Sequence, residues 1–430
     1  MSALERCERA LARIAADERL NAWSHVASRE AVLAAQASDQ RRRQGQLLGP
    51  LDGRLVAIKG NIAVAGWPLE GGLRARRGLR AERDAPVVAR LRAAGVVLLG
   101  LTTMDEGALG ADGQALTGPI HHPRAFGYSV GGSSGGSAVA VAAGQCDFAM
   151  GSDTIGSIRL PAALTGIVGF KSSPGRLSTE GVLPVHPEYD HVGPLVRQLD
   201  ELLPILDQLG LGPDQGHAVT RSTSLLTIGI VTDLESYGVQ AEVAACYRAT
   251  IDHLAQQGIR LSARSLSDFE PARLRRHVFS LAEYEMWRQH GERLERYPLE
   301  YSARLTSLLR YGAGISAEQR EVHELALRTF RQQWAVWAQS VDLVLTPTTP
   351  VLAFAHTAPP PAALADLTAL ATAACVPALS APGLKVATRG SPEGEPIGLQ
   401  FIGLPGGDRA LIRHAQHLSA LIAASSQRSD

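Results

Sequence analysis

The chain has little lysine, little cysteine and no excess of charge of either sign. Only Lys59, Lys171 and Lys385 are lysines among 42 basic residues, and 42 acidic residues bring the formal net charge to zero. A balanced charge argues against a protein held to nucleic acid mainly through phosphates, or to a membrane surface by a basic patch. Because arginine is otherwise so strongly preferred, each lysine that the chain keeps requires an explanation.

The chain also lacks the residue patterns of metal sites, disulfide frameworks and membrane spans. Its four cysteines lie far apart with no C-x-x-C pair, and its 13 histidines include no H-E-x-x-H. No apolar run approaches the roughly 18 to 20 residues that span a bilayer. The polar N-terminal segment is not typical of a secretory signal. We therefore expect a cytoplasmic protein without a metal, a cofactor or a membrane contact.

Apolar periodicity predicts an α/β fold. Apolar residues between positions 4 and 14 recur at helical spacing, and Leu55–Ile58 is a short run typical of a buried strand. A helix is expected to begin at Pro86, and a strand to follow over Val96–Leu99. Strand, helix and strand in succession indicate a layered sheet.

The sequence changes character between about residues 202 and 340. Leu226–Val231 is strand-like, and long segments rich in Arg, Glu and Leu follow it. Asp342–Leu345 and Pro396–Leu404 return to the strand pattern. We expect the middle region to form a helical cover on the sheet, and to shape a pocket together with residues near Asp366–Pro382.

Lys59 directly follows the predicted strand over Leu55–Ile58. Burial at such a position would lower the pKa of the lysine and make a neutral amine available as a base. The alternative is a lysine whose alkyl stem packs on the strand end while its amine reaches solvent. This segment alone favours neither interpretation.

A glycine- and serine-rich segment, Gly131–Ser137, leads into a predicted helix over Ala138–Ala143. Glycines beside hydroxyls let main-chain N–H groups approach a ligand closely. The segment is no phosphate loop, because no Gly-Lys-Ser/Thr follows it. Gly127–Gly131 fits the G-x-S-x-G pattern of a nucleophile elbow, but His121–Phe126 before it does not have a strand pattern. A flexible linker is the alternative, and the compact Ala/Val helix that follows argues against it.

The segment Gly151–Ala162 places Ser157 after a run of small residues. Such a loop can direct several backbone N–H groups at one oxygen, as an oxyanion hole requires. Asp153 and Arg159 bracket the loop, and we expect them to pair and to hold it rigid. The alternative is an ordinary turn with a helix-capping serine.

Together, these three segments resemble the amidase signature family. The family joins K-D-N-I after an apolar strand, G-G-S-S-G-G-S, and then D-T-G-G-S-I-R-x-P-A about two dozen residues later. Five further short motifs extend the likeness: Gly49–Gly53, Met104–Glu106, Gly169–Lys171, Thr346–Pro350 and Pro396–Gln400. The resemblance covers nearly the whole chain, least securely from 202 to 340.

The resemblance implies one amidase domain over residues 1–430, built on a large mixed β-sheet with helices on both faces. Within it, residues 1–201 would carry the catalytic motifs, 202–340 a variable helical cover, and 341–430 a return to the sheet. Ser157 corresponds to the family's nucleophile, Ser133 to its bridging serine in a cis peptide, and Lys59 to its general base. The backbone of three residues corresponds to the oxyanion hole: Thr154, Ile155 and Gly156. Three more are expected to support the site: Ser134, Asp153 and Arg159.

Two positions depart from the family pattern. Gly60 stands where Asp usually follows the lysine, so we expect a local turn contact to be missing. Ile155 stands where D-T-G-G-S has its first glycine. Its N–H group remains, whereas its side chain is expected to narrow the acyl or leaving-group pocket.

The activity implied by the resemblance is hydrolysis of a carboxylic amide to an acid and ammonia or an amine, through an acyl-enzyme on Ser157. The expected partner is a small-molecule amide, without nucleic acid or membrane, and we allow for a homodimer. The first alternative is the glutaminase (A) subunit of a tRNA-dependent amidotransferase, which belongs to the same family and needs partner subunits. The second is a catalytically inactive binding protein on the same fold.

Overall fold

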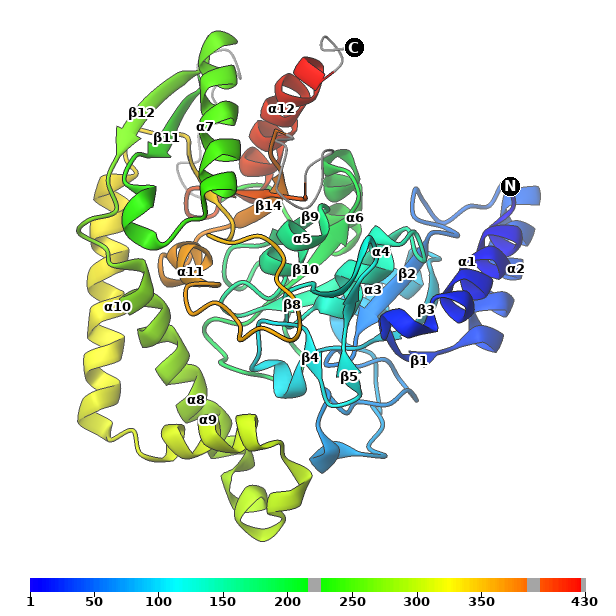
Figure 1. Cartoon of the computed structure of the whole chain (residues 1–430). Helices are drawn as coiled ribbons and strands as arrows, with labels where there is room; N and C mark the ends of the chain where they lie inside the picture. The colour runs from blue at the N-terminus through cyan, green and yellow to red at the C-terminus, as the bar shows by residue number, and fades with distance from the viewer. Residues whose placement is uncertain (216–225, 385–394, 427–430) are drawn as a thin grey trace.

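A computed structural model describes residues 1–215, 226–384 and 395–426 of the chain (Figure 1). Eleven strands form its main sheet: β1 (Trp23–Val26), β2 (Leu55–Lys59), β3 (Val97–Thr102), β8 (Phe148–Asp153), β9 (Val168–Lys171), β10 (His191–Val196), β11 (Thr227–Val231), β12 (Arg260–Arg264), β13 (Leu343–Pro347), β14 (Ala378–Pro382) and β15 (Gly398–Ile402). Their order across the sheet is β1-β3-β2-β8-β10-β9-β14-β15-β13-β11-β12. The predicted large mixed sheet is confirmed.

Helices cover both faces of this sheet (Figure 1). Those of the N-terminal half are α1 (Ala3–Ala16), α2 (Ser28–Arg43), α3 (Pro86–Ala93), α4 (Gly135–Ala142), α5 (Arg159–Thr165) and α6 (Leu202–Gln208). Those of the C-terminal half are α7 (Ala241–Gln256), α8 (Pro271–Arg296), α9 (Ala303–Ala313), α10 (Ala317–Trp337), α11 (Asp366–Ala373) and α12 (Asp408–Ser426). None of the helices in the described ranges combines the length and apolar character needed to cross a membrane.

The direction of the strands places two of the predicted motifs side by side. β2 pairs in parallel with β3 on one side and with β8 on the other. The carboxyl ends of parallel strands meet at one edge of a sheet. Lys59, the last residue of β2, therefore lies beside the end of β8, where the segment containing Ser157 begins.

The alternation of side chains along β2 decides which way Lys59 points. Leu55 and Ala57 pack in a core cluster with α1, α2 and α4, whereas Val56 and Ile58 pack in the cluster on the opposite face. Successive side chains of a strand point to opposite faces. The Lys59 side chain points to the same face of the sheet as those of Leu55 and Ala57. It therefore projects towards α4, the helix into which the Gly/Ser-rich segment leads.

Most predicted elements are confirmed, and one prediction is wrong. The absence of a strand over His121–Phe126 is contradicted by a short hairpin of β6 (His121–His122) and β7 (Ala125–Ser129). The His121 ring stacks on Phe126 with ring centroids 3.9 Å apart, a contact between strands that single-strand periodicity does not reveal. The helix predicted over Ala138–Ala143 begins earlier, at Gly135.

The region between residues 202 and 340 contributes strands as well as helices. β11 and β12 extend one end of the main sheet, with β11 paired in parallel to both β12 and β13. The long helices α8 and α10 pack together with α9 on the side of the molecule far from α1 and α2 (Figure 1). This helical layer faces the edge of the sheet at which β2 and β8 end.

Candidate active site

Lys59 is buried at the centre of the predicted site. Its side chain has no solvent exposure, and its Nζ donates hydrogen bonds of 2.8 Å to Ser133 Oγ and 2.8 Å to Ser152 Oγ. Burial lowers the pKa of this lysine from 10.5 to about 7, although nearby carboxylates oppose the shift. A substantial fraction of the amine is therefore neutral near pH 7, as a base requires.

Ser152 is a member of the site that the sequence did not single out. Besides the bond from Lys59, its Oγ accepts a hydrogen bond of 3.0 Å from Asn61 Nδ2, and its carbonyl oxygen accepts one of 3.1 Å from Ser134 Oγ. Ser152 thus links β2, β8 and the start of α4. The parallel pairing of β2 with β8 would have predicted this neighbour of Lys59, but pairing is not visible in a single sequence.

Ser133 follows a cis peptide bond from Gly132, as the family resemblance predicts. Asp105 packs directly beneath this bond, and a Cβ added at Gly132 would lie 2.5 Å from Asp105 Oδ1. The other carboxylate oxygen accepts hydrogen bonds from the N–H groups of Asp112 (3.2 Å) and Gly113 (3.3 Å). Burial, reinforced by the charge of Asp112, raises the pKa of Asp105 to about 7.

Asp190 is a second acid near Lys59 that the sequence did not reveal, and it is half-buried. Its carboxylate accepts hydrogen bonds from Thr154 Oγ1 (2.6 Å) and from the backbone N–H groups of Val185 (2.8 Å) and His186 (3.1 Å). Burial raises its pKa to about 6, while these hydrogen bonds and Lys59 oppose the shift. Lys59, Asp105 and Asp190 therefore form a group of electrostatically interacting acids and bases that titrate within a narrow pH range.

The predicted nucleophile, Ser157, lies next to this group in the segment between β8 and α5. Its carbonyl oxygen accepts a hydrogen bond of 3.1 Å from the Ser134 N–H group, which ties it to the residue after Ser133. Ser157 is half-buried, and within the described ranges its Oγ makes no hydrogen bond. The hydroxyl is thus free to approach a substrate carbonyl.

The backbone before Ser157 has the form that the oxyanion-hole prediction requires. Among the described residues, nothing accepts a hydrogen bond from the N–H groups of Ile155, Gly156 or Ser157. Gly156 has φ +141°, and a Cβ there would lie 2.5 Å from Thr368 Oγ1, so glycine is needed for both conformation and space. These unpaired N–H groups border the space in front of Ser157.

A buried ion pair holds this segment in place. Arg159 donates from Nη2 to Asp153 Oδ1 (2.9 Å) and from Nε to Oδ2 (3.0 Å), and neither side chain is exposed. Its Nη1 reaches Gln400 Oε1 (2.6 Å) in β15 and the carbonyl oxygen of Thr368 (2.8 Å) in α11. The Arg159 guanidinium, against the opposing effect of burial, holds the pKa of Asp153 well below its usual range. The expected pairing is present, and it joins the segment to two distant elements.

Comparisons with known proteins identify the family of the chain. A family model described as Amidase matches residues 5–412. The chain belongs to the amidase family. The A subunit of glutamyl-tRNA(Gln) amidotransferase from Chloroflexus aggregans is 34% identical over 96% of this chain and 92% of the relative. The amidases are enzymes that act on amide C–N bonds, and this chain is an enzyme of that class.

Two solved amidase structures share the fold over almost the whole chain. One is described as a crystal structure of an amidase, with a TM-score of 0.89 and 30% identity over 98% of this chain and 96% of that chain. The other is the native peptide amidase from Stenotrophomonas maltophilia, with a TM-score of 0.82 and 25% identity over 98% and 94% of the two chains. The helical region is therefore included in the amidase fold.

A cavity of about 210 Å³ opens in front of Ser157. Ile155 lines it, so the side chain that departs from the amidase pattern does face the pocket. α8 and α9 supply Arg275, Phe279 and Arg304 to the opposite wall, as expected of the helical region. The rest of the lining comes from residues 108–112, from Leu160 and Val185, and from the 360–365 segment, which lies just before the predicted range of Asp366–Pro382.

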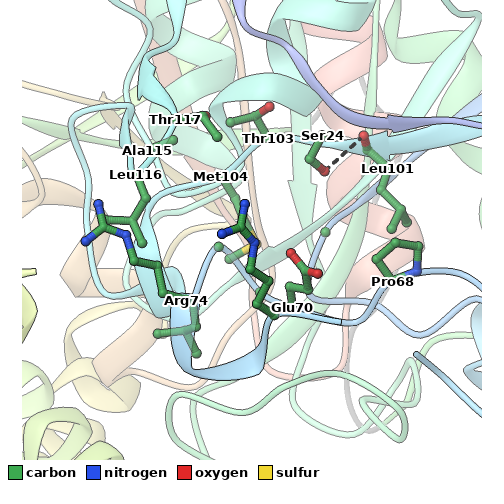
Figure 2. A pocket seen from close by; sticks show the side chains of 15 residues that line it. Ser24, Pro68, Glu70, Arg74, Leu101, Thr103, Met104, Ala115, Leu116 and Thr117 are labelled. Atoms are coloured by element: carbon green, nitrogen blue, oxygen red, sulfur yellow. Dashed lines mark hydrogen bonds between the residues drawn. The ribbon is translucent and has the colours of Figure 1, made fainter. Parts of the chain in front are cut away.

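The second departure, Gly60, borders a separate and larger cavity of about 330 Å³. Figure 2 shows the side chains of Glu70 and Arg74 in its wall, across from Ser24 and Thr103. A Cβ at Gly60 would lie only 3.0 Å from the carbonyl oxygen of Thr102, so the usual Asp would not fit without a shift of that strand end. Ser157 lines the smaller cavity and not this one.

Lys171 is not part of this site. Lys171 is buried in β9 and donates to the carbonyl oxygens of Val376 (2.9 Å) and Ser172 (3.1 Å). Burial lowers its pKa to about 7. Its hydrogen bonds fix the chain around β9 and β14, so this lysine has a structural role. Lys385 lies outside the described residues.

Proposed function

We propose that the chain hydrolyses a carboxylic amide through an acyl-enzyme on Ser157, with Ser133 as the bridging residue and Lys59 as the general base. One observation carries this proposal. Lys59 is fully buried with a pKa of about 7, and its Nζ donates a hydrogen bond to the Ser133 hydroxyl. Ser134, the residue after Ser133, donates a hydrogen bond from its N–H group to the Ser157 carbonyl oxygen. A lysine at a strand end with its amine in solvent would have neither property.

The proposed reaction proceeds in two acyl-transfer steps. Ser157 Oγ attacks the amide carbonyl carbon while its proton passes to Ser133 Oγ, whose own proton passes to neutral Lys59. The same relay returns a proton to the nitrogen as the C–N bond breaks, so ammonia or an amine leaves and the acyl group stays on Ser157. Water then attacks the carbonyl carbon of the ester and loses its proton through the relay to Lys59. That proton returns to Ser157 Oγ as the ester C–O bond breaks and the acid is released.

The proposed oxyanion hole consists of backbone N–H groups between Thr154 and Ser157. They carry no other hydrogen bond among the described residues, so they can donate to the oxygen that becomes negative in the tetrahedral intermediate. Three residues support this loop without facing the substrate. Ser134 donates a hydrogen bond to the Ser157 carbonyl oxygen, and the ion pair of Asp153 with Arg159 fixes the loop to α11 and β15. We therefore assign them positioning roles.

The curated relatives favour one physiological form of this reaction. Several of them at 32 to 35% identity are described as the A subunit of glutamyl-tRNA(Gln) amidotransferase. Hydrolysis of the glutamine amide within an assembly of subunits is therefore better supported by these relatives than a self-sufficient amidase. Both forms use the same chemistry at Ser157 and differ in acyl donor, in partner subunits and in the fate of the ammonia.

A screen of amides tests the shared chemistry. Ammonia release is measured from L-glutamine and from aliphatic, aryl and ureido amides, using wild-type protein, Ser157→Ala and the exposed control Ser307→Ala. We expect turnover by the wild type and the control, and a loss of about 10³-fold or more in Ser157→Ala with the fold intact. Unchanged turnover in Ser157→Ala would refute the assignment of the nucleophile.

Purification from the native host distinguishes the physiological forms. Stable partner subunits, together with glutaminase activity that depends on them, favour the amidotransferase form. Full turnover by the isolated chain, alone or as the homodimer that we allow for, favours a self-sufficient amidase. An inactive binding protein would show neither, although it would still fold; fractionation of the host also checks the predicted cytoplasmic location.

A further inference from the structure

The cavity in front of Ser157 has an uneven distribution of charge. Most of its lining is apolar, including Leu109, Leu160 and Phe279. Its charged lining residues are Asp112, Arg275 and Arg304. A volume of about 210 Å³ is below the roughly 300 Å³ at which pockets for drug-sized ligands begin, so the acyl group that it accepts is small.

Asp112 is already neutralised by Arg304. A single guanidinium nitrogen, Nη1 of Arg304, donates to both carboxylate oxygens of Asp112 at 2.7 and 2.8 Å. The Asp112 side chain is only 7% exposed, whereas that of Arg304 is 48% exposed. Within the described ranges, Nε and Nη2 of Arg304 donate to no other residue, so this arginine retains donors while the acid has no free charge.

Arg275 has a similar arrangement. Its Nε donates to Asp366 Oδ1 at 2.5 Å, and Asp366 lies behind the cavity wall rather than in its lining. Within the described part of the chain, the two terminal nitrogens of Arg275 make no hydrogen bond. The cavity is therefore lined by two guanidinium groups with unused donors, and the carboxylates paired with them, Asp112 and Asp366, are already engaged.

This arrangement discriminates between anionic, neutral and zwitterionic acyl groups. A carboxylate can take up guanidinium donors in short, charge-assisted hydrogen bonds. An uncharged aliphatic end would leave those donors without a partner. An ammonium group would face two like charges, and the one acid in the lining of this cavity, Asp112, is already paired.

We propose that this cavity selects amides whose acyl group ends in a second carboxylate and carries no ammonium group, that is, monoamides of small dicarboxylic acids, with Arg275 and Arg304 holding that carboxylate. The substrate class rests on the proposed acyl transfer at Ser157, and it disfavours L-glutamine, the acyl donor of the amidotransferase form. Arg275 and Arg304 are binding residues, one from each of the helices α8 and α9.

Three amides of equal chain length test the proposal: glutaramate, pentanamide and L-glutamine. Glutaramate has the terminal carboxylate, pentanamide replaces it with a methyl group, and L-glutamine adds an α-ammonium group. We expect kcat/KM for glutaramate to exceed both others by at least tenfold. Equal or faster hydrolysis of pentanamide, or a preference for L-glutamine over glutaramate, would overturn the proposal while leaving amide hydrolysis itself established.

Substitution of the two arginines tests whether they cause the preference for glutaramate. Two double variants, Asp366→Asn with Arg275→Gln and Asp112→Asn with Arg304→Gln, should each reduce the glutaramate-to-pentanamide ratio by about tenfold. Double variants are used because either arginine substitution alone would leave a buried acid, Asp366 or Asp112, unpaired. Arg310→Gln, on the same helix as Arg304 and exposed, is the control and should leave the ratio unchanged. A ratio that survives both arginine variants would overturn the assignment to these residues.

A binding measurement distinguishes failure of the proposed carboxylate site from failure of the proposed hydrolysis. Calorimetry on Ser157→Ala protein should show glutaramate bound at least tenfold more tightly than pentanamide or L-glutamine, and the preference should be lost when Arg275→Gln and Asp366→Asn are added. If no amide is turned over but this binding is found, the proposed hydrolysis fails and the carboxylate site stands. If amides are turned over and no binding preference is found, the carboxylate site fails alone.

Discussion

The two walls of the cavity at Ser157 are built in different ways. The wall on the sheet side is a short segment between β8 and α5, held by backbone hydrogen bonds and by the buried pair of Asp153 and Arg159. The opposite wall consists of side chains from α8 and α9, among them Arg275 and Arg304, which are partly exposed. In the proposed reaction, the first wall places the reacting atoms, and the second meets the variable part of the substrate.

This difference separates chemistry from selectivity. Changes in the sheet-side wall and its lysine are expected to abolish catalysis or to destabilise the fold. Changes that act on the shape of the cavity should instead redistribute activity among substrates.

Removal of the base should have the largest effect. Lys59→Ala should lower kcat/KM by about 10²- to 10⁴-fold at neutral pH, because general-base catalysis contributes on that scale. Lys59→Arg should not restore activity, since a guanidinium does not give up its proton in a protein. Steady-state ammonia release measures both, and near-wild-type activity in Lys59→Arg would contradict the role of a neutral amine.

Breaking the buried ion pair should be the next largest effect, and it should appear in stability. Asp153→Asn leaves the Arg159 charge buried without its partner, which typically costs about 3–5 kcal/mol. Chemical denaturation at pH 7 measures the free energy of unfolding. The control, Asp207→Asn, removes the acid of an ion pair with Arg409 in which Asp207 is 48% exposed, and should cost at most about 1 kcal/mol. Similar losses in the two variants would contradict the structural importance of the buried pair.

The sheet-side wall was largely predictable from the sequence, whereas the helical wall was not. Lys59, Ser133 and Ser157 belong to short local patterns, each confined to a few residues, and the family resemblance gave their roles. Ser152 was missed because its importance comes from the pairing of β2 with β8. Asp190 was missed for a similar reason: it meets Lys59 through tertiary packing, and its own surroundings in the sequence contain no recognisable pattern.

Arg275 and Arg304 show why the other wall escaped prediction. They are two of many arginines in helical segments, and nothing in their local sequence separates them from Arg310, which is exposed on the same helix as Arg304. Only the packing of α8 and α9 against the sheet edge brings them to the cavity. Predicting that the helical region shapes a pocket was feasible, but naming its residues required the tertiary structure.

The smallest expected effect concerns Ile155, a residue of the sheet-side wall that faces the substrate. Ile155→Gly restores the usual residue of the family and removes a side chain that lines the cavity. Hydrophobic pocket changes of this size are worth about 1–3 kcal/mol, so the kcat/KM ratio of benzamide to propionamide should rise about tenfold or more. An unchanged ratio would show that Ile155 does not limit the acyl pocket.

The pH dependence of covalent labelling at Ser157 tests the central claim most directly. A serine-directed sulfonyl fluoride is reacted with folded protein, and the modified peptide is mapped by mass spectrometry. Acid protonates Lys59, so the account predicts labelling at Ser157 with a rate that rises with pH through an apparent pKa near the value of about 7 for this lysine. That apparent value belongs to Lys59 together with Asp105 and Asp190, and the rise should disappear in Lys59→Ala. Absence of labelling at Ser157, or a rate that does not depend on pH and on Lys59, would contradict the account.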